Sequence, residues 1–108
     1  MQNAAPSAPS STSDTSLTTS LNQELSRVDA HVGDDLVGFS AYEVCDDGTY
    51  SFHHTEVFEE YSGHGYGKQL AAGVMDVARD KSFTIAPTCP FLRKYMDANP
   101  ETQDVRAD

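Results

Sequence analysis

The sequence predicts one α+β domain in which an antiparallel strand meander leads into a strand–loop–helix–strand unit. Apolar and polar residues alternate along two runs, residues 36–44 and 49–57, and the turn signal Asp46-Asp47-Gly48 lies between them. After Val57 the apolar spacing changes from that of a strand to that of a helix, and a glycine-rich segment, residues 63–67, marks the change. These observations together favour a mixed sheet with helices.

The meander is expected to begin with a strand over residues 25–32, where the alternation is imperfect. The preceding segment, residues 1–22, is rich in Ser and Thr and holds almost no large apolar side chain. Such a segment buries too little surface to offset the conformational entropy that it loses on ordering. We therefore predict a disordered tail over residues 1–22 and a folded domain over residues 23–108.

The second half of the domain is predicted to hold two helices and a strand. Apolar residues at helical spacing over residues 70–78 predict a helix from residue 66 to residue 80 or 81. Alternating apolar residues over 83–87 suit a short buried strand that runs parallel to the strand before the helix. A second helix is expected over residues 91–97, and the Asn99-Pro100 pair should end it.

The composition argues against several classes of protein. The formal charge is -10, with 17 acidic residues against 7 Lys and Arg, and this balance disfavours nucleic acid as a partner. An acidic surface attracts an amine or a basic peptide, and it also serves solubility. No run approaches the roughly 20 apolar residues of a membrane span, so no membrane association is expected.

The two cysteines, Cys45 and Cys89, have no partner at zinc-ligand spacing, so no metal site is expected. The first 26 residues contain no Lys, no Arg and no apolar run, unlike a signal or transit peptide. We therefore expect a cytoplasmic protein with reduced thiols.

The segment Ser62-Gly63-His64-Gly65-Tyr66-Gly67-Lys68 lies between a predicted strand and a predicted helix. Backbone N–H groups at a helix N-terminus lack intrahelical partners, and the helix dipole favours negative charge there. Glycines let the backbone approach a ligand closely. The segment therefore predicts a phosphate-binding loop to which His64 and Lys68 add positive charge, with a plain glycine-rich turn as the alternative. A nucleotide P-loop would need Ser or Thr where Gln69 stands.

The run from Gly63 to Leu70 resembles the acyl-CoA pyrophosphate loop of the GNAT acetyltransferases, whose pattern Q/R-x-x-G-x-G/A opens a helix. Ser62 stands where that pattern has Gln or Arg. The resemblance narrows to the minimal, NATD-type GNAT-like domains and covers roughly residues 25–105. Its most specific segments are His54-Thr55-Glu56-Val57 and Ile85-Ala86-Pro87-Thr88-Cys89-Pro90-Phe91, which flank the glycine loop in that order.

The resemblance implies a GNAT-like fold and an N-acetyltransferase that moves an acetyl group from acetyl-CoA to an amine. The acceptor, a small amine or a protein lysine, stays open. By resemblance, acetyl-CoA lies between two splayed parallel strands, around residues 52–57 and 83–87. The residues expected to line its site are Gly63, His64, Gly65, Tyr66, Gly67, Lys68 and Val57.

Cys89 is the first candidate catalytic residue. Pro90 favours the first position of a helix, which puts Cys89 at the N-cap of the second helix. A thiol there lies at the positive end of the helix dipole, which favours its ionised form. It would act as an acid towards a leaving thiolate or carry the acetyl group transiently. A small buried cysteine without a chemical role is the alternative.

His54 is the second candidate. Tyr50, Phe52 and His54 share one face of an ideal strand, so His54 is expected to face the core or a cleft. An imidazole there would deprotonate an incoming ammonium group or pair with Cys89. A hydrogen-bonded structural histidine is the alternative. Two further functions remain open, namely a non-catalytic acyl-CoA-binding or regulatory module and an interaction module without a cofactor.

Overall fold

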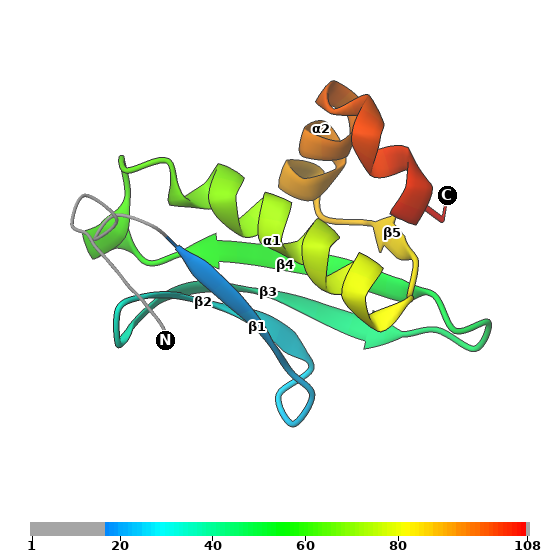
Figure 1. Cartoon of the computed structure of the whole chain (residues 1–108), viewed down its shortest axis with the longest axis horizontal. Coiled ribbons are helices and arrows are strands. Elements are labelled where there is room, and N and C mark those ends of the chain that lie inside the picture. Colours follow the sequence, from blue (N-terminus) through cyan, green and yellow to red (C-terminus); the bar gives the residue numbers. More distant parts are fainter. Residues whose placement is uncertain (1–16, 108) are drawn as a thin grey trace, which may run out of the picture.

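The computed structural model describes residues 17–107, which form a five-stranded sheet with both α-helices on one face (Figure 1). In chain order the elements are β1 (Thr18–Asn22), β2 (Arg27–Val32), β3 (Asp35–Val44), β4 (Tyr50–Val57), the 3-10 helix η2 (Glu59–Tyr61), α1 (Tyr66–Lys81), β5 (Ile85–Pro87), α2 (Pro90–Ala98) and the 3-10 helix η3 (Pro100–Val105). The strand order is β1-β2-β3-β4-β5, with only the β4–β5 pair parallel. The predicted α+β mixed sheet is therefore confirmed.

Strand β1 lies in the segment that the sequence assigns to the tail. It pairs antiparallel with β2, and the turn between them is closed by Ser26 in a left-handed conformation with φ 54°. The side-chain oxygen of Asn22 accepts a hydrogen bond of 3.1 Å from the backbone N–H of Leu25 within this turn. The folded part thus includes Thr18–Asn22, which corrects the predicted boundary after residue 22. The rest of the predicted tail, residues 1–16, lies outside the described residues.

The hydrophobic core lies between the sheet and the two helices. Its fully buried members include Val28 and Phe52 from the sheet, Leu70 and Val74 from α1, and Leu92 from α2. These positions on α1 follow the helical spacing of the sequence, so one stripe of the helix is buried against the strands. The core therefore holds α1 against strands β1 to β4, and the start of α1 lies beside the end of β4, where the two line the same cavity.

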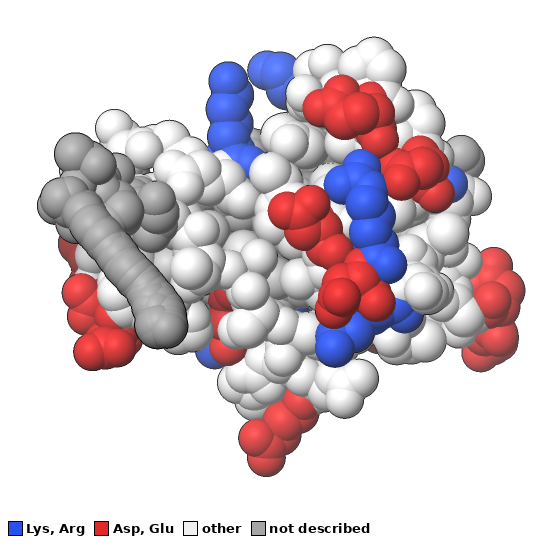
Figure 2. Space-filling view, in the orientation of Figure 1, with Lys and Arg blue, Asp and Glu red and all other residues white. Residues whose placement is uncertain are grey.

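Arg79 of α1 connects this helix to η3. Its Nε and Nη2 donate to the carboxylate of Asp104 at 2.9 Å and 3.1 Å, and its Nη2 also donates to the carbonyl of Glu101 at 3.0 Å. Figure 2 shows basic and acidic side chains interleaved on this part of the surface. The 3-10 helix η3 is therefore held against α1 by charge-assisted hydrogen bonds as well as by the buried Val105.

The hydrogen bond from Arg79 lowers the pKa of Asp104 below its ordinary value. The ion pair should therefore stabilise the fold above the ordinary pKa of aspartate, and this stability should be lost as the pH falls through the lowered pKa. We expect Asp104→Asn to lower the melting temperature at neutral pH and to flatten its decline below about pH 4. Thermal melts across that range test this, and an acid limb identical to that of the wild type would contradict it.

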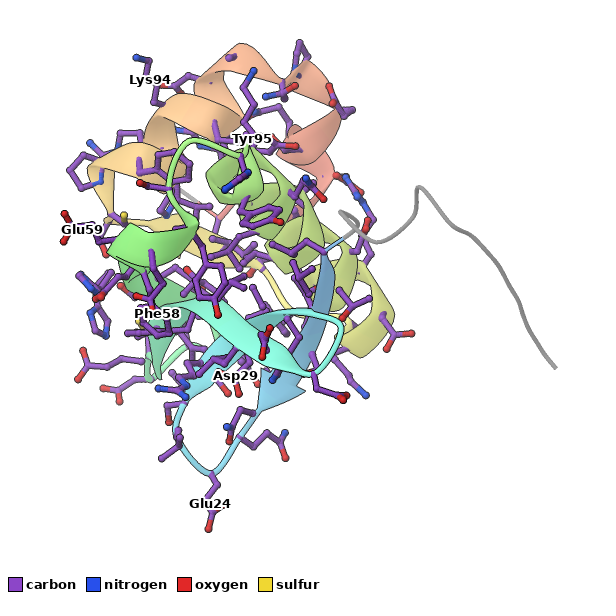
Figure 3. The ribbon with its side chains drawn as sticks, turned by 90° about the vertical axis from the view of Figure 1, so that its left-hand side faces the viewer. Glu24, Asp29, Phe58, Glu59, Lys94 and Tyr95 are labelled. Atoms are coloured by element: carbon purple, nitrogen blue, oxygen red, sulfur yellow. The ribbon has the colours of Figure 1, made fainter. Side chains whose placement is uncertain are left out.

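The opposite face of the sheet carries a small polar and aromatic cluster. Asp29 and Phe39 are cross-strand partners in β2 and β3. Arg27 pairs with Asp29 at 2.6 Å and lies 4.7 Å above the ring of Phe39. Figure 3 labels Asp29 on the lower side of the sheet, away from the helices above. The two faces of the sheet therefore differ in chemistry, and the side on which each β4 residue lies decides its role.

None of the helices within residues 17–107 combines the length and the apolar character needed to cross a bilayer. In the same range, His, Cys, Asp and Glu side chains do not gather in threes at a place that would hold a metal ion.

Candidate functional site

The candidate site lies where strands β4 and β5 separate. Their parallel pairing ends at Phe52↔Pro87, whereas β4 stays paired with β3 as far as Gly38↔Val57. Among the described strands, the stretch of β4 beyond Phe52 therefore has a neighbour on one edge only. A cavity of about 280 Å³ lies beside this stretch, between β4, the loop before α1 and Phe91 of α2.

Hydrogen bonds to one carbonyl hold the point of separation. The backbone N–H of Cys89 donates to the carbonyl of Phe52 at 2.9 Å, and the hydroxyl of Thr88 donates to the same oxygen at 3.0 Å. The Nε of Arg93 also donates to the carbonyl of Pro87 at 3.2 Å. These bonds, from one backbone and two side-chain donors, fasten the start of α2 to the end of the parallel pair and so fix the place where the strands separate.

The loop before α1 forms one wall of the cavity. The lining residues are Thr55, Val57, Tyr61, Ser62, Gly63, Gly65, Tyr66, Gly67 and Phe91. Gly63 and Gly65 have φ +83° and +77°, a region that side chains rarely adopt, and a Cβ added at either would meet no atom within 4 Å. Gly65 is the N-cap of α1, and no side chain caps this helix. The first amides of α1 are thus left for an acceptor from outside, as an anion site requires.

The structure brings together five of the seven residues predicted for cofactor binding. Val57, Gly63, Gly65, Tyr66 and Gly67 all line the cavity. The other two, His64 and Lys68, do not line it. The ring of His64 stacks on Tyr66 with centroids 5.3 Å apart, and Lys68 borders a separate, neighbouring cavity.

Cys89 occupies the N-cap of α2, and Pro90 takes the first helical position, in agreement with the prediction. Its side chain is buried, and within residues 17–107 the thiol has no hydrogen-bond partner. Cys89 thus lies at the point where the strands separate, directly after β5. It is not one of the cavity-lining residues, although Phe91 of the same helix is.

The predicted orientation of His54 is wrong, because β4 contains a bulge. Ala41 pairs with His54 and the next residue, Tyr42, pairs with Phe52, so His53 is an extra residue that reverses the alternation. His54 therefore lies on the face opposite Phe52. Its imidazole lies 3.2 Å from a carboxylate oxygen of Glu56 and 5.8 Å from the ring of Phe39, and its side chain is 54% exposed.

The bulge puts Thr55 on the cavity side of β4 instead. The hydroxyl of Thr55 lies 2.9 Å from that of Ser40, which is fully buried. Tyr61 adds a second hydroxyl to the wall, and partial burial with the nearby carboxylates of Asp35 and Glu60 raises its pKa above the ordinary value. The position of Thr55 on this side was not predictable from the sequence, because a bulge leaves no mark on the alternation of residue types.

Comparison with known proteins agrees with this geometry. A family model described as GCN5-related N-acetyl-transferase matches residues 27–105, from β2 to the end of η3. Protein NATD1 of Xenopus tropicalis is 34% identical over 62 residues, which cover 57% of this chain and 57% of that protein. Human Protein NATD1 is 36% identical over 50 residues, which cover 46% of this chain and 44% of that protein. The chain spans about half the length of the curated relatives it matches.

Among solved structures, the chain is similar to the crystal structure of ribosomal-protein-alanine N-acetyltransferase from Brucella melitensis biovar Abortus 2308. The TM-score is 0.44 and the sequence identity 23%, and the match covers 76% of this chain and 61% of that one. The family assignment depends on the family model, which extends over most of the described residues. The resemblance drawn from the glycine loop and the Pro-x-Cys-Pro-Phe segment is confirmed at the level of the family. This chain, with its N-acetyltransferase-type domain, belongs to the GCN5-related N-acetyltransferase family.

Proposed function

We propose that this protein transfers an acetyl group from acetyl-CoA to an amine. The observation that carries the proposal is the cavity of about 280 Å³ at the separation of β4 and β5, with the uncapped start of α1 as its wall. A thioester on a long flexible arm, ending in a diphosphate, suits a site that combines a free strand edge with unpaired helix amides.

The donor would bind along the length of this cavity. The backbone amides of Gly65–Lys68 would donate hydrogen bonds to the diphosphate, since this turn offers free N–H groups and the positive end of the helix dipole. Val57 lines the cavity, and the free edge of β4 before it would follow the pantetheine arm. Lys68 and His64 lie next to the turn rather than in the cavity, so they would act on the diphosphate from the outside.

In the transfer step, the amine nitrogen bonds to the acetyl carbon and the carbon–sulfur bond breaks. The amine must lose a proton, and the departing thiolate of CoA must gain one. Cys89 lies at the separation of the strands and is the residue proposed to serve this exchange, either as an acid towards the thiolate or as a transient carrier of the acetyl group. His54 lies on the far face of the sheet, so the proposal assigns no role to it.

Replacing Cys89 by Ala is expected to lower kcat about 100-fold, which is the lower range for loss of a proton-transfer group. Cys45→Ala is the matched control, because Cys45 is exposed in the turn between β3 and β4. Protein incubated with acetyl-CoA without an acceptor separates the two roles, since a carrier gains one acetyl group by mass and an acid does not. An unchanged kcat in Cys89→Ala would remove this residue from the mechanism.

The test of the function itself is a thermal melt with and without acetyl-CoA, followed by acetylation assays on lysine peptides and polyamines. A ligand at 100 times its Kd adds ~2.7 kcal/mol to the free energy of unfolding, so binding should raise the melting temperature clearly. Acetyl-CoA that leaves the melt unchanged would contradict the proposal.

A second candidate is acyl-CoA binding without catalysis, which one feature favours. Ser62 stands where the GNAT pattern has Gln or Arg, and its hydroxyl donates to the carbonyl of Glu59 at 2.9 Å. The side chain is thus used within η2 and the following turn. Tight CoA binding by calorimetry, together with no transfer to any amine in the panel, would select this candidate.

A further inference from the structure

Two hydroxyl groups meet across strands β3 and β4 beside the first cavity. Ser40 of β3 and Thr55 of β4 are cross-strand partners in neighbouring strands (Figure 1), and their side-chain oxygens lie 2.9 Å apart. Ser40 is fully buried, whereas Thr55 is partly exposed and lines the cavity. The transfer step described for Cys89 uses neither hydroxyl, so the pair is available for a further role.

Burial fixes the direction of the hydrogen bond between these two hydroxyls. Among residues 17–107, the oxygen of Thr55 is the only hydrogen-bond partner of the Ser40 hydroxyl. A fully buried donor without an acceptor is strongly unfavourable, so Ser40 must donate and Thr55 must accept. The hydroxyl proton of Thr55 therefore has no acceptor within the described part of the chain. Its acceptor must come from a ligand or solvent in the cavity that Thr55 lines.

The position of Thr55 along β4 indicates which ligand atom it meets. Because of the bulge at His53, Thr55 lies only two cross-strand pairs beyond Phe52, and two steps along a strand span about 7 Å. Strands β4 and β5 separate at Phe52, whose carbonyl accepts the backbone N–H of Cys89. The amides proposed for the diphosphate, Gly65–Lys68, follow the other end of β4. A long arm separates the diphosphate of CoA from its sulfur, so the thioester belongs near Phe52, within reach of Thr55.

We propose that the Thr55 hydroxyl donates a hydrogen bond to the carbonyl oxygen of the acetyl group, and that Ser40 is a positioning residue that directs this hydroxyl. The assignment rests on the proposed function. When the amine nitrogen bonds to the acetyl carbon, an electron pair of the carbonyl bond moves to the oxygen, and it returns when the carbon–sulfur bond breaks. Thr55 keeps its proton throughout. Its hydrogen bond strengthens as the oxygen becomes negative, so it accelerates transfer without tightening the binding of acetyl-CoA.

Thr55→Val removes the hydroxyl at nearly constant shape and tests the assignment. With the amine that the wild type acetylates fastest, kcat and kcat/KM should both fall about 100-fold, while the Kd of acetyl-CoA from calorimetry stays at the wild-type value. Thr55→Ser keeps a hydroxyl and should restore most of the activity. Thr84→Val is the matched control, because Thr84 is exposed between α1 and β5. An unchanged kcat in Thr55→Val, or a loss that appears in Kd alone, would overturn the assignment.

Ser40→Ala tests the positioning role. Without its buried donor the Thr55 hydroxyl is free to rotate, so kcat should fall roughly tenfold. In the Thr55→Val background the same change should have no further effect on kcat, since no hydroxyl is left to direct. Losses of kcat that multiply in the double variant would show that Ser40 acts independently of Thr55, which would overturn its positioning role.

Infrared difference spectroscopy of bound acetyl-CoA, isotope-labelled at the acetyl carbonyl, gives a readout that needs no acceptor amine. A donated hydrogen bond weakens the carbonyl double bond, so the labelled band should lie at lower frequency in the wild type than in Thr55→Val. Identical bands in the two proteins, with transfer by the wild type intact, would overturn the assignment and leave the proposed function standing. Failure of the wild type to bind acetyl-CoA would overturn both together.

Discussion

Gly38→Ala is expected to cost more stability than replacement of any of the glycines in turns, on the order of 3 kcal/mol. A Cβ at this position of β3 would lie next to the backbone of β4, 3.0 Å from the Cα of Val57 and closer still to the carbonyl oxygen of Glu56. Backbone atoms cannot rotate away as a side chain can, so the two strands would have to move apart. The damage would reach the wall of the cavity, because Val57 lines it.

Denaturant unfolding of Gly38→Ala beside Gly33→Ala measures this cost. Gly33 lies in the turn between β2 and β3 with φ +61°, and an added Cβ there would meet nothing within 4 Å. Its replacement should cost only the strain of a left-handed alanine, about 1–2 kcal/mol. Equal losses in the two variants would mean that the strands yield easily at Gly38. The reduced stability of Gly38→Ala should be accompanied by weaker binding of acetyl-CoA.

Gly67→Asp is expected to weaken acetyl-CoA binding about 100-fold, a change of ~2.7 kcal/mol. The new carboxylate would stand in the first turn of α1, where it would repel the diphosphate and compete for the same amides. The fold should tolerate the change, since an acidic residue in the first turn of a helix is stabilising and glycine is a poor helix former. The contact with Phe91 can be relieved, because that side chain is partly exposed.

Gly67→Asn is the matched control, since it has the same size and no charge. Calorimetry on the pair separates electrostatic repulsion from the crowding of Phe91, which both variants share. Thermal melts without ligand should show both variants folded. If the Asp and Asn variants bound acetyl-CoA equally well, the diphosphate would not lie at these amides, and the proposed binding mode would have to be abandoned.

The regular elements were predictable because local patterns determine them. The apolar stripe over residues 70–78 predicted α1 to within a residue of the observed Tyr66–Lys81, since one buried face fixes a helix. The Asn99-Pro100 pair correctly ended α2. In contrast, β1 consists largely of Thr and Ser, and it forms because it can pair with the free edge of β2. No pattern in the residues of β1 predicts this pairing.

The residues that line the candidate site could be predicted in the loop before α1 but not in strand β4. The glycines of residues 63–67 need positive φ or close approach, and these requirements are visible in the residue types. The face of β4 that meets the cavity depends on the bulge at His53, a mismatch in the pairing of β3 with β4 that the residue types of neither strand reveal. The same holds for Lys68 and Lys94, which share a cavity only because α2 folds back beside α1.

The two donors that converge on the carbonyl of Phe52 have a kinetic consequence. The opening between β4 and β5 can widen only if the hydrogen bonds from Cys89 and Thr88 break together. The opening should therefore have the same width with and without bound acetyl-CoA. Association with acetyl-CoA should then proceed in a single phase, at a rate proportional to ligand concentration and without a rearrangement step. The amide of Cys89 should exchange slowly with deuterium even before any ligand arrives.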